Sequence, residues 1–291
     1  MPGAPLVQLQ TEPEKHGAAL LTFEEQDRSC GWLRRKQRFY DVCTSTNDVA
    51  TSLVKDGYTD EIVVICNHQT GGKGRQGRRW DSWPGNLALS IVIRPQLKLA
   101  LAHRIMMASA LATVDALERL GIKAQIKWPN DILIKSNDDK CVEKLGPFRK
   151  VGGILLEHSS VGDWIDKSII GLGLNLARPG PEQHIEILPQ MGFLCDQRES
   201  LDLTLLCDTI LESMEHMLSD GIRDATSQFL LESVKDKSVL LGKNVQVNTG
   251  DSCFRGVAEN LGDDGGLIIR RGDNSLQTIY FGDVAMMPYL L

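Results

Sequence analysis

Short apolar and polar blocks alternate between residue 40 and about residue 235, and this pattern predicts a domain that mixes strands with helices. Short apolar runs rich in β-branched side chains predict buried strands. Strands are expected on this basis at 39–42, 61–66, 86–93, 124–127, 132–135, 151–156 and 168–174. The polar segment 136–147 separates two of these runs and indicates an exposed insertion.

Helical periodicity is clearest between residues 99 and 120. Leu101, Ile105, Ala108 and Ala112 follow at i, i+4, i+7 and i+11, which places them on one helix face. Gly121 is a natural stop, because glycine readily adopts the left-handed conformation that ends many helices. Two further helices are expected at about 201–219 and 222–234.

The pattern changes after about Asp236. Glycines separate short alternating runs such as 244–248 and 267–270. Strands at such short spacing predict a small antiparallel barrel of about 50 residues. We therefore expect three parts: a loosely ordered leader over 1–38, a main domain over 39–235 and a C-terminal domain over 236–291.

Composition narrows the class of protein. Of the 291 residues, 42% are hydrophobic and 24% are charged, and the formal net charge is −6, so a global basic field for nucleic acid is not expected. No run approaches the roughly 18 uninterrupted apolar residues that indicate a membrane span. The first residues show neither a secretory nor a transit pattern, and the seven scattered cysteines favour free thiols in a reducing compartment. We expect a cytoplasmic protein.

The most informative stretch is residues 68–80, His-Gln-Thr-Gly-Gly-Lys-Gly-Arg-Gln-Gly-Arg-Arg-Trp. It interleaves four glycines with four cations, and no carboxylate lies between Glu61 and Asp81. Glycines let the backbone approach an oxyanion, and the cations match its charge. The stretch predicts a mobile loop that an anionic ligand orders; a plain surface hairpin is the alternative. The P-loop spacing is absent, and Trp80–Pro84 breaks the helix that a dinucleotide fingerprint needs.

Four other segments carry candidate chemistry. Ser45-Thr-Asn47 offers three small hydrogen-bonding side chains or, alternatively, a helix N-cap. Lys127-Trp-Pro-Asn-Asp131 gathers a cation, an amide and a carboxylate on a rigid turn, with a plain tight turn as the alternative. Gly171-Leu-Gly-Leu-Asn175 predicts a strand on whose bare backbone a flat ligand can lie, or a simple bulge. Lys150 stands at the mouth of a strand, where a lysine is usually only solvated.

These segments, in their order along the chain, resemble the biotin protein ligase family, including the eukaryotic holocarboxylase synthetases. The resemblance rests on Ser-Thr-Asn, the glycine-rich stretch, Lys-Trp-Pro-Asn-Asp, Lys-x-x-Gly-Ile-Leu-x-Glu and Gly-Leu-Gly-Leu-Asn, and it covers about residues 40–290. It implies an α+β fold, with a mixed-sheet catalytic domain related to class II aminoacyl-tRNA synthetases and a small C-terminal SH3-like β-barrel. It also implies that ATP, with Mg²⁺, activates biotin as biotinyl-5′-AMP. Biotin would then pass to a lysine of the biotin carboxyl carrier domain of a carboxylase.

The same resemblance implies roles for individual residues. Biotin would be bound by Ser45, Thr46, Asn47, Gln69, Gly72, Lys73, Gly74, Arg75, Lys150, Gly153 and Gly171. ATP and the adenylate would be bound by Arg75, Arg78, Trp80, Lys127, Asn130, Lys150 and Asn175. The catalytic group would be Lys150, Arg75, Lys127 and Asp131, because cations neutralise the charge that builds when a carboxylate meets a triphosphate. Trp128 and Gly152-Gly153 are candidate walls of the slot for the biotin ring. The resemblance leaves the Mg²⁺ ligands open, apart from ATP itself.

Two positions depart from the family pattern. The loop usually reads Gly-Arg-Gly-Arg, whereas its first arginine is here Lys73, which keeps the charge but loses the bidentate fork. Asp81 follows Trp80, where an apolar residue is common. The competing interpretations are a lipoate ligase or octanoyltransferase of the same fold and a non-catalytic interaction module.

Some members of the family also bind DNA through an N-terminal winged helix-turn-helix. Here 44 residues precede Ser45, and they show no paired helical pattern. We therefore expect neither DNA nor a membrane as a partner. We expect a monomer or a homodimer.

Overall fold

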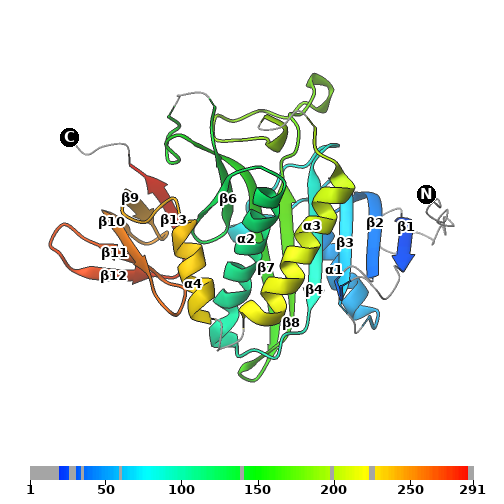
Figure 1. Ribbon diagram of the computed structural model, residues 1–291, viewed down its shortest axis with the longest axis horizontal. Coiled ribbons are helices and arrows are strands. Elements are labelled where there is room, and N and C mark those ends of the chain that lie inside the picture. The colour runs from blue at the N-terminus through cyan, green and yellow to red at the C-terminus, as the bar shows by residue number, and fades with distance from the viewer. Residues whose placement is uncertain are drawn as a thin grey trace. The chain divides into compact units, whose positions relative to one another are not determined.

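The computed structural model describes residues 20–25, 31–33, 36–58, 61–137, 141–196, 200–222 and 227–287. The chain forms two compact units, each built from two stretches of sequence. The first unit combines Met1–Gln96 with Leu155–Ile185, and the second combines Leu97–Ile154 with Glu186–Leu291. Figure 1 labels the main helices and strands of both units.

The first unit contains a mixed sheet. Its strands lie in the order β1 (Leu20–Glu25), β2 (Lys36–Cys43), β3 (Ile62–Gln69), β4 (Leu87–Ile93), β8 (Trp164–Leu174), and the end of β7 (Phe148–Val161) follows β8. β2 and β3 run parallel, whereas β1–β2, β3–β4 and β4–β8 are antiparallel pairs. Helix α1 (Thr46–Lys55) packs against β3, β4 and β8, and its buried face joins their apolar side chains in one core cluster.

The second unit places helices beside antiparallel strands. The first half of β7 pairs with β6 (Asp131–Lys135), and β6 pairs with β5 (Ala124–Lys127). Helix α2 (Ala102–Arg119) packs against β5, β6, α3 (Leu203–His216) and α4 (Ser227–Asp236), as Figure 1 shows for the helices. Single helical turns occupy Leu99–Leu101, Leu194–Asp196 and Met217–Gly221 here, and Arg75–Gly77 and Pro181–Gln183 in the first unit.

Helix α2 and the turn before it, Leu99–Arg119, are long and apolar enough to cross a membrane by length and composition alone. Half of this window is buried inside the protein, and the helix contacts α3 and α4 along its length. This packing is typical of a core helix. Gly121 follows the helix with φ +83°, so it is the predicted stop.

The C-terminal sheet is antiparallel throughout. Its order is β12 (Leu276–Ile279), β11 (Leu267–Arg270), β10 (Cys253–Leu261), β9 (Asn244–Asn248) and β13 (Asp283–Met286). The two strands predicted at 244–248 and 267–270 are confirmed with their bounds. Alternate positions of β9 are buried, which is the period-2 pattern that identified it.

Three predictions need correction. The leader predicted over 1–38 contributes β1, which pairs with β2, although it lacked a recognisable periodicity. β7 and β8 extend beyond the predicted runs at their shared hairpin, because most residues from 157 to 164 are exposed and give no apolar signal. β7 also begins earlier, at Phe148. The insertion over 136–147 is not wholly exposed, since Leu145 is buried and Lys144 forms a β-bridge with Met286.

Candidate functional site

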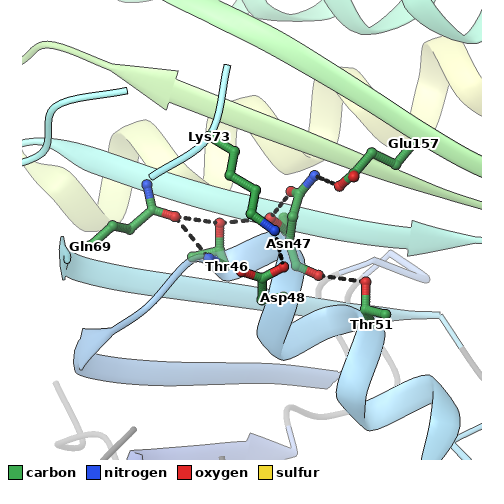
Figure 2. Close-up of polar contacts among 8 residues, drawn as sticks. Thr46, Asn47, Asp48, Thr51, Gln69, Lys73 and Glu157 are labelled. Carbon is green, nitrogen blue, oxygen red and sulfur yellow. Dashed lines mark hydrogen bonds and ion pairs between the residues drawn. The ribbon is translucent and has the colours of Figure 1, made fainter. Parts of the chain in front are cut away.

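A cluster of amide and hydroxyl groups lies in the first unit where α1, β3 and β4 meet (Figure 2). We call it the amide–hydroxyl cluster; it consists of Thr46, Asn47, Gln69, Ser90 and Glu157. The backbone nitrogen and the hydroxyl of Thr46 donate to Gln69 Oε1 at 2.8 and 3.2 Å. Ser90 Oγ lies 2.7 Å from Thr46 Oγ1 and 2.6 Å from Asn47 Oδ1. Asn47 Nδ2 donates to Glu157 Oε2 at 2.5 Å.

The local fold explains why these groups converge. Parallel pairing of β2 with β3 puts Cys43 opposite Gln69, and α1 begins three residues after Cys43. The first turn of α1 therefore reaches the end of β3. All members of the cluster except Glu157 are buried, and burial without water favours groups that satisfy one another.

Ser45 occupies the N-cap position of α1, as the alternative interpretation of Ser-Thr-Asn predicted. Its backbone is extended, with φ −157° and ψ 138°, but its side chain makes no capping hydrogen bond. The capping role is therefore wrong in its chemistry, although the helix itself is confirmed. Ser45 is buried beside the amide–hydroxyl cluster residue Thr46.

The glycine-rich stretch forms a small hairpin. Lys73 and Arg79 are bridged across it, Gly74 N donates to Arg78 O at 2.7 Å, and Trp80 N donates to Gly72 O at 2.9 Å. A Cβ on Gly72 would lie 2.4 Å from Trp80 O. Gly72 is therefore required by the hairpin's own backbone. The predicted mobility of this stretch stays a prediction.

Two of the hairpin's cations have carboxylate partners. Lys73 Nζ lies 2.5 Å from Asp48 Oδ1 on α1, and Arg79 Nε lies 3.0 Å from Asp81 Oδ1. Arg78 donates to Gln76 Oε1 at 2.8 Å. These contacts are at least partly exposed and contribute little stability individually. They nevertheless hold Lys73 against the start of α1.

The glycines of Gly-Leu-Gly-Leu-Asn make room for side chains of the protein. A Cβ on Gly171 would lie 2.4 Å from Asn47 Oδ1, and one on Gly173 would lie 2.6 Å from the Trp80 ring. Both positions are thus covered by side chains of the protein itself, and the expectation that a flat ligand lies against this backbone stays a prediction. Further along, Asn175 Oδ1 is 3.5 Å from Asn86 Nδ2, and Asn86 Oδ1 is buried with no hydrogen-bond partner among the residues that the structure describes.

A second charged cluster lies in the second unit, and we call it the lysine cluster: Lys127, Asp131 and Lys150. Lys150 Nζ is 2.5 Å from Asp131 Oδ1, and Lys127 Nζ is 3.6 Å from Asp131 Oδ2. The β6–β7 ladder sets this geometry, because Asp131 begins β6 opposite Gly153 and Lys150 lies near the start of β7. Two cations share one carboxylate, so these three groups carry a net positive charge that suits an anionic ligand.

Burial lowers the pKa of Lys127 below its ordinary value, and the nearby carboxylates of Asp131 and Asp283 only partly oppose this shift. A lysine that loses solvation without full pairing gains from binding an anion. The carboxylate of Asp131 is engaged by both lysines, which makes it an anchor for their ammonium groups.

Side-chain hydrogen bonds on both sides fix the turn between β5 and β6. The Trp128–Pro129 peptide is cis. Trp128 Nε1 donates to Gly265 O at 3.0 Å, and Asn130 Nδ2 donates to Ile154 O at 2.8 Å. Trp128 is buried by this contact with the C-terminal sheet's loop. The turn predicted as rigid is thus fixed on one side by β7 and on the other by residues 262–266.

The structure distributes the sequence-predicted residues over the two units. The first unit holds Ser45, Thr46, Asn47, Gln69, Gly72, Lys73, Gly74, Arg75, Arg78, Trp80, Gly171 and Asn175. The second holds Lys127, Asn130, Asp131, Lys150 and Gly153.

Four residues that touch these groups were missed as site residues: Asp48, Asn86, Ser90 and Glu157. Ser90 lies in the middle of an otherwise apolar strand, which was the one sequence signal for it.

Comparisons with known proteins agree with this arrangement. The profile of the biotin/lipoate A/B protein ligase family matches residues 39–175, and that of the biotin protein ligase C-terminal domain matches residues 240–287. A biotin–[acetyl-CoA-carboxylase] ligase of Paracoccus denitrificans is 30% identical over 237 residues, covering 78% of this chain and 90% of the relative. The bifunctional ligase/repressor BirA of Bacillus subtilis is 28% identical over 254 residues, covering 85% of this chain and 73% of the relative.

Solved structures show the same fold. The biotin protein ligase from Aquifex aeolicus in complex with biotin and ATP superposes with a TM-score of 0.68 at 23% identity, covering 87% of this chain and 99% of that one. The Leishmania major enzyme in complex with biotinyl-5-AMP gives a TM-score of 0.54 at 25% identity, covering 84% and 98%. These relatives are biotin ligases, so the lipoate interpretation is not favoured. The chain belongs to the biotin protein ligase family.

Proposed function

We propose that this protein joins biotin to ATP, forming biotinyl-5′-AMP and pyrophosphate, and then transfers biotin to a lysine of a carboxylase's biotin carboxyl carrier domain. The observation that carries the proposal is the lysine cluster, in which Lys127 and Lys150 share the single carboxylate of Asp131. A carboxylate and a triphosphate repel each other, and fixed cations stabilise the charge that develops as they react.

The amide–hydroxyl cluster is suited to the ureido ring of biotin. Because Gln69 Oε1 accepts from Thr46, the Nε2 group of Gln69 remains a hydrogen-bond donor. Ser45, Thr46 and Asn47 add small polar groups, and a cyclic urea requires both donors and acceptors. In this proposal Gly171 serves biotin indirectly, by leaving space for Asn47.

The lysine cluster would hold the biotin carboxylate and the α-phosphate through Lys127 and Lys150. Asp131 keeps both ammonium groups in place. Asn130, which fixes its turn against β7, would line the nucleotide side. Gly153, which pairs with Asp131 in the ladder, would line the biotin slot.

The hairpin at residues 71–80 would cover the biotin tail and the adenylate. Gly72, Lys73, Gly74 and Arg75 would line the tail, while Arg78 and Trp80 would face the nucleotide together with Asn175. Arg75 begins the single helical turn of the hairpin, and its guanidinium suits the phosphate. A closed hairpin also keeps water from the mixed anhydride.

Mg²⁺ would be held mainly through the phosphates of ATP, as is common for this ion. Within the described ranges, no group of three or more histidine, cysteine, aspartate or glutamate side chains could hold a metal. Asp131, the carboxylate of the lysine cluster, is engaged by two ammonium groups.

We further propose that the C-terminal sheet is an SH3-like barrel covering 236–291, after a catalytic domain over 39–235 related to class II aminoacyl-tRNA synthetases. The antiparallel order of the five strands supports a barrel. The setting would be the cytoplasm, and the six cysteines of the described residues are free thiols. We propose that the protein is a monomer or a homodimer that binds neither DNA nor a membrane. Specific operator binding in a gel shift would contradict the proposal that it does not bind DNA.

Biotin-dependent exchange of pyrophosphate into ATP tests the function directly. The purified chain should catalyse the exchange with biotin, and mass spectrometry should find biotinyl-5′-AMP bound. Exchange that depended on lipoate and not on biotin would reverse the choice of substrate. A chain that showed no nucleotide-dependent thermal shift would instead support a non-catalytic interaction module.

A further inference from the structure

Glu157 is the exposed member of the otherwise buried amide–hydroxyl cluster, and its carboxylate contacts Asn47 (Figure 2). Glu157 is exposed on β7, whereas its partner Asn47 is 3% exposed. Asn47 Nδ2 donates to Glu157 Oε2 at 2.5 Å. A bond between a buried amide and a carboxylate is stronger than a bond between neutral groups, so this contact can fix a side chain deeper in the protein.

The contact decides the orientation of the Asn47 amide. A carboxylate accepts hydrogen bonds, so the atom of Asn47 that faces Glu157 is its NH₂ group. The oxygen of the amide must then face Ser90, whose Oγ lies 2.6 Å away. Gly171 leaves the space that this oxygen occupies, because a Cβ there would lie 2.4 Å from it.

The orientation of Asn47 in turn directs two hydroxyl hydrogens. Ser90 is fully buried and has one hydrogen, with Asn47 Oδ1 and Thr46 Oγ1 both in reach at 2.6 and 2.7 Å. Asn47 Oδ1 has no hydrogen of its own, while the Thr46 hydroxyl has one. Both contacts are satisfied when Ser90 donates to Asn47 and the Thr46 hydroxyl, which also has Gln69 Oε1 in reach at 3.2 Å, turns its one hydrogen to the nearer Ser90 Oγ. The oxygen of Thr46 then remains an acceptor.

We propose that Glu157 is a positioning residue for recognition of the ureido ring: it orients Asn47, which takes the hydrogen of Ser90 and so leaves the hydroxyl oxygen of Thr46 open to accept from a ureido N–H. The inference rests on the proposed function. Together with the Nε2 donor of Gln69, the cluster presents one acceptor and one donor, which a cyclic urea matches. A dithiolane ring offers no such hydrogen bonds, and sites built for a polar group discriminate strongly against analogues that lack it.

The test compares Glu157→Ala with Glu157→Gln in biotin-dependent ATP–pyrophosphate exchange. In Glu157→Ala the KM for biotin should rise roughly tenfold, the effect of losing one charge-assisted hydrogen bond. The KM for ATP should stay within about twofold of the wild-type value, as for an uncoupled site. Glu157→Gln keeps an oxygen that accepts from Asn47, so it should restore the KM for biotin to within about threefold of wild type. Desthiobiotin, which keeps the ureido ring, should show the same pattern.

His158→Ala is the matched control, because His158 is the exposed neighbour of Glu157 whose side chain points to the opposite face of β7. It should leave both KM values and the melting temperature unchanged. The double variant Asn47→Ala/Glu157→Ala should bind biotin no more weakly than Asn47→Ala alone, since Glu157 acts through Asn47.

Three results would overturn the inference while the wild-type chain is active: an unchanged KM for biotin in Glu157→Ala, equal defects in the Ala and Gln variants, or an equal rise in the KM for ATP with a lower melting temperature. A wild-type chain without biotin-dependent exchange would overturn the proposed function and this inference together.

Discussion

Replacing Lys150 by alanine should damage adenylation far more than stability. The lysine is 31% exposed and pairs with Asp131 at 2.5 Å. Its removal leaves Asp131 paired with Lys127 at 3.6 Å, so the half-buried carboxylate keeps a partner. At this exposure the lost pair should cost about 1 kcal/mol of unfolding free energy, which shifts the melting temperature by roughly 2–4 °C in a chain of this size.

The expected loss of rate is larger. Removing one fixed donor from a site that stabilises developing charge typically costs about 10²–10³ in rate, or about 3–4 kcal/mol. The assay is single-turnover formation of biotinyl-5′-AMP, followed by quenching, with the melting temperature measured on the same samples. The substitution should lower the rate constant of adenylate formation and leave the fold intact.

Lys237→Ala provides a matched control. Lys237 belongs to the same unit, is 33% exposed and pairs with Glu118 at 2.6 Å, but it lies outside the lysine cluster. It should show a similar change in melting temperature with an unchanged rate. Equal rate losses in the two variants, or a rate loss in Lys150→Ala that merely follows its melting temperature, would refute the charge-neutralising role of Lys150.

Three further predictions address the pH profile, the nucleotide side and the hairpin. Burial lowers the pKa of Lys127, so this lysine loses its proton at a lower pH than an ordinary lysine. The rate of adenylation should therefore decline as the pH rises through that pKa. Lys127→Arg stays protonated, so its pH–rate profile should lack this decline. In Gly173→Ala a Cβ would lie 2.6 Å from the Trp80 ring. The KM for ATP should therefore rise roughly tenfold, the size of a typical overpacking penalty, while the KM for biotin changes little. Equal rises in the two KM values would show a general distortion instead. Arg75→Gly should release labelled biotinyl-5′-AMP faster in a filter-binding assay, because a cation facing the phosphate is lost; unchanged retention would argue against that role.

Much of the secondary structure was predictable from local pattern. Strands β5, β9 and β11 have the predicted bounds, because they are short, bury alternate residues and end at clear turn residues. Helix α2 was predictable from its 3.6-residue period and from Gly121. The outer ends of β7 and β8 were not, because pairing with a neighbouring strand stabilises them without an apolar sequence signal. Strand β1 was missed because its short apolar run lies in a polar, acidic leader without a sustained period.

The candidate site was predictable in its ingredients but not in its connections. Thr46, Gln69 and Lys150 stand out by residue type and order. That Asp131 is shared by two lysines depends on the β6–β7 register, and the bond between Asn47 and Glu157 joins residues 110 positions apart. The role of Gly171 and Gly173 as space for Asn47 and Trp80 likewise required coordinates.

The sequence by itself determined the elements, the supply of cations and amides, and the resemblance to a ligase family, because these follow from local periodicity and from the order of short segments. Only the tertiary structure decided which polar groups satisfy one another. Hydrogen bonds reach about 3 Å and depend on direction, so the partner of a buried side chain is fixed by strand register and packing between segments far apart in the chain.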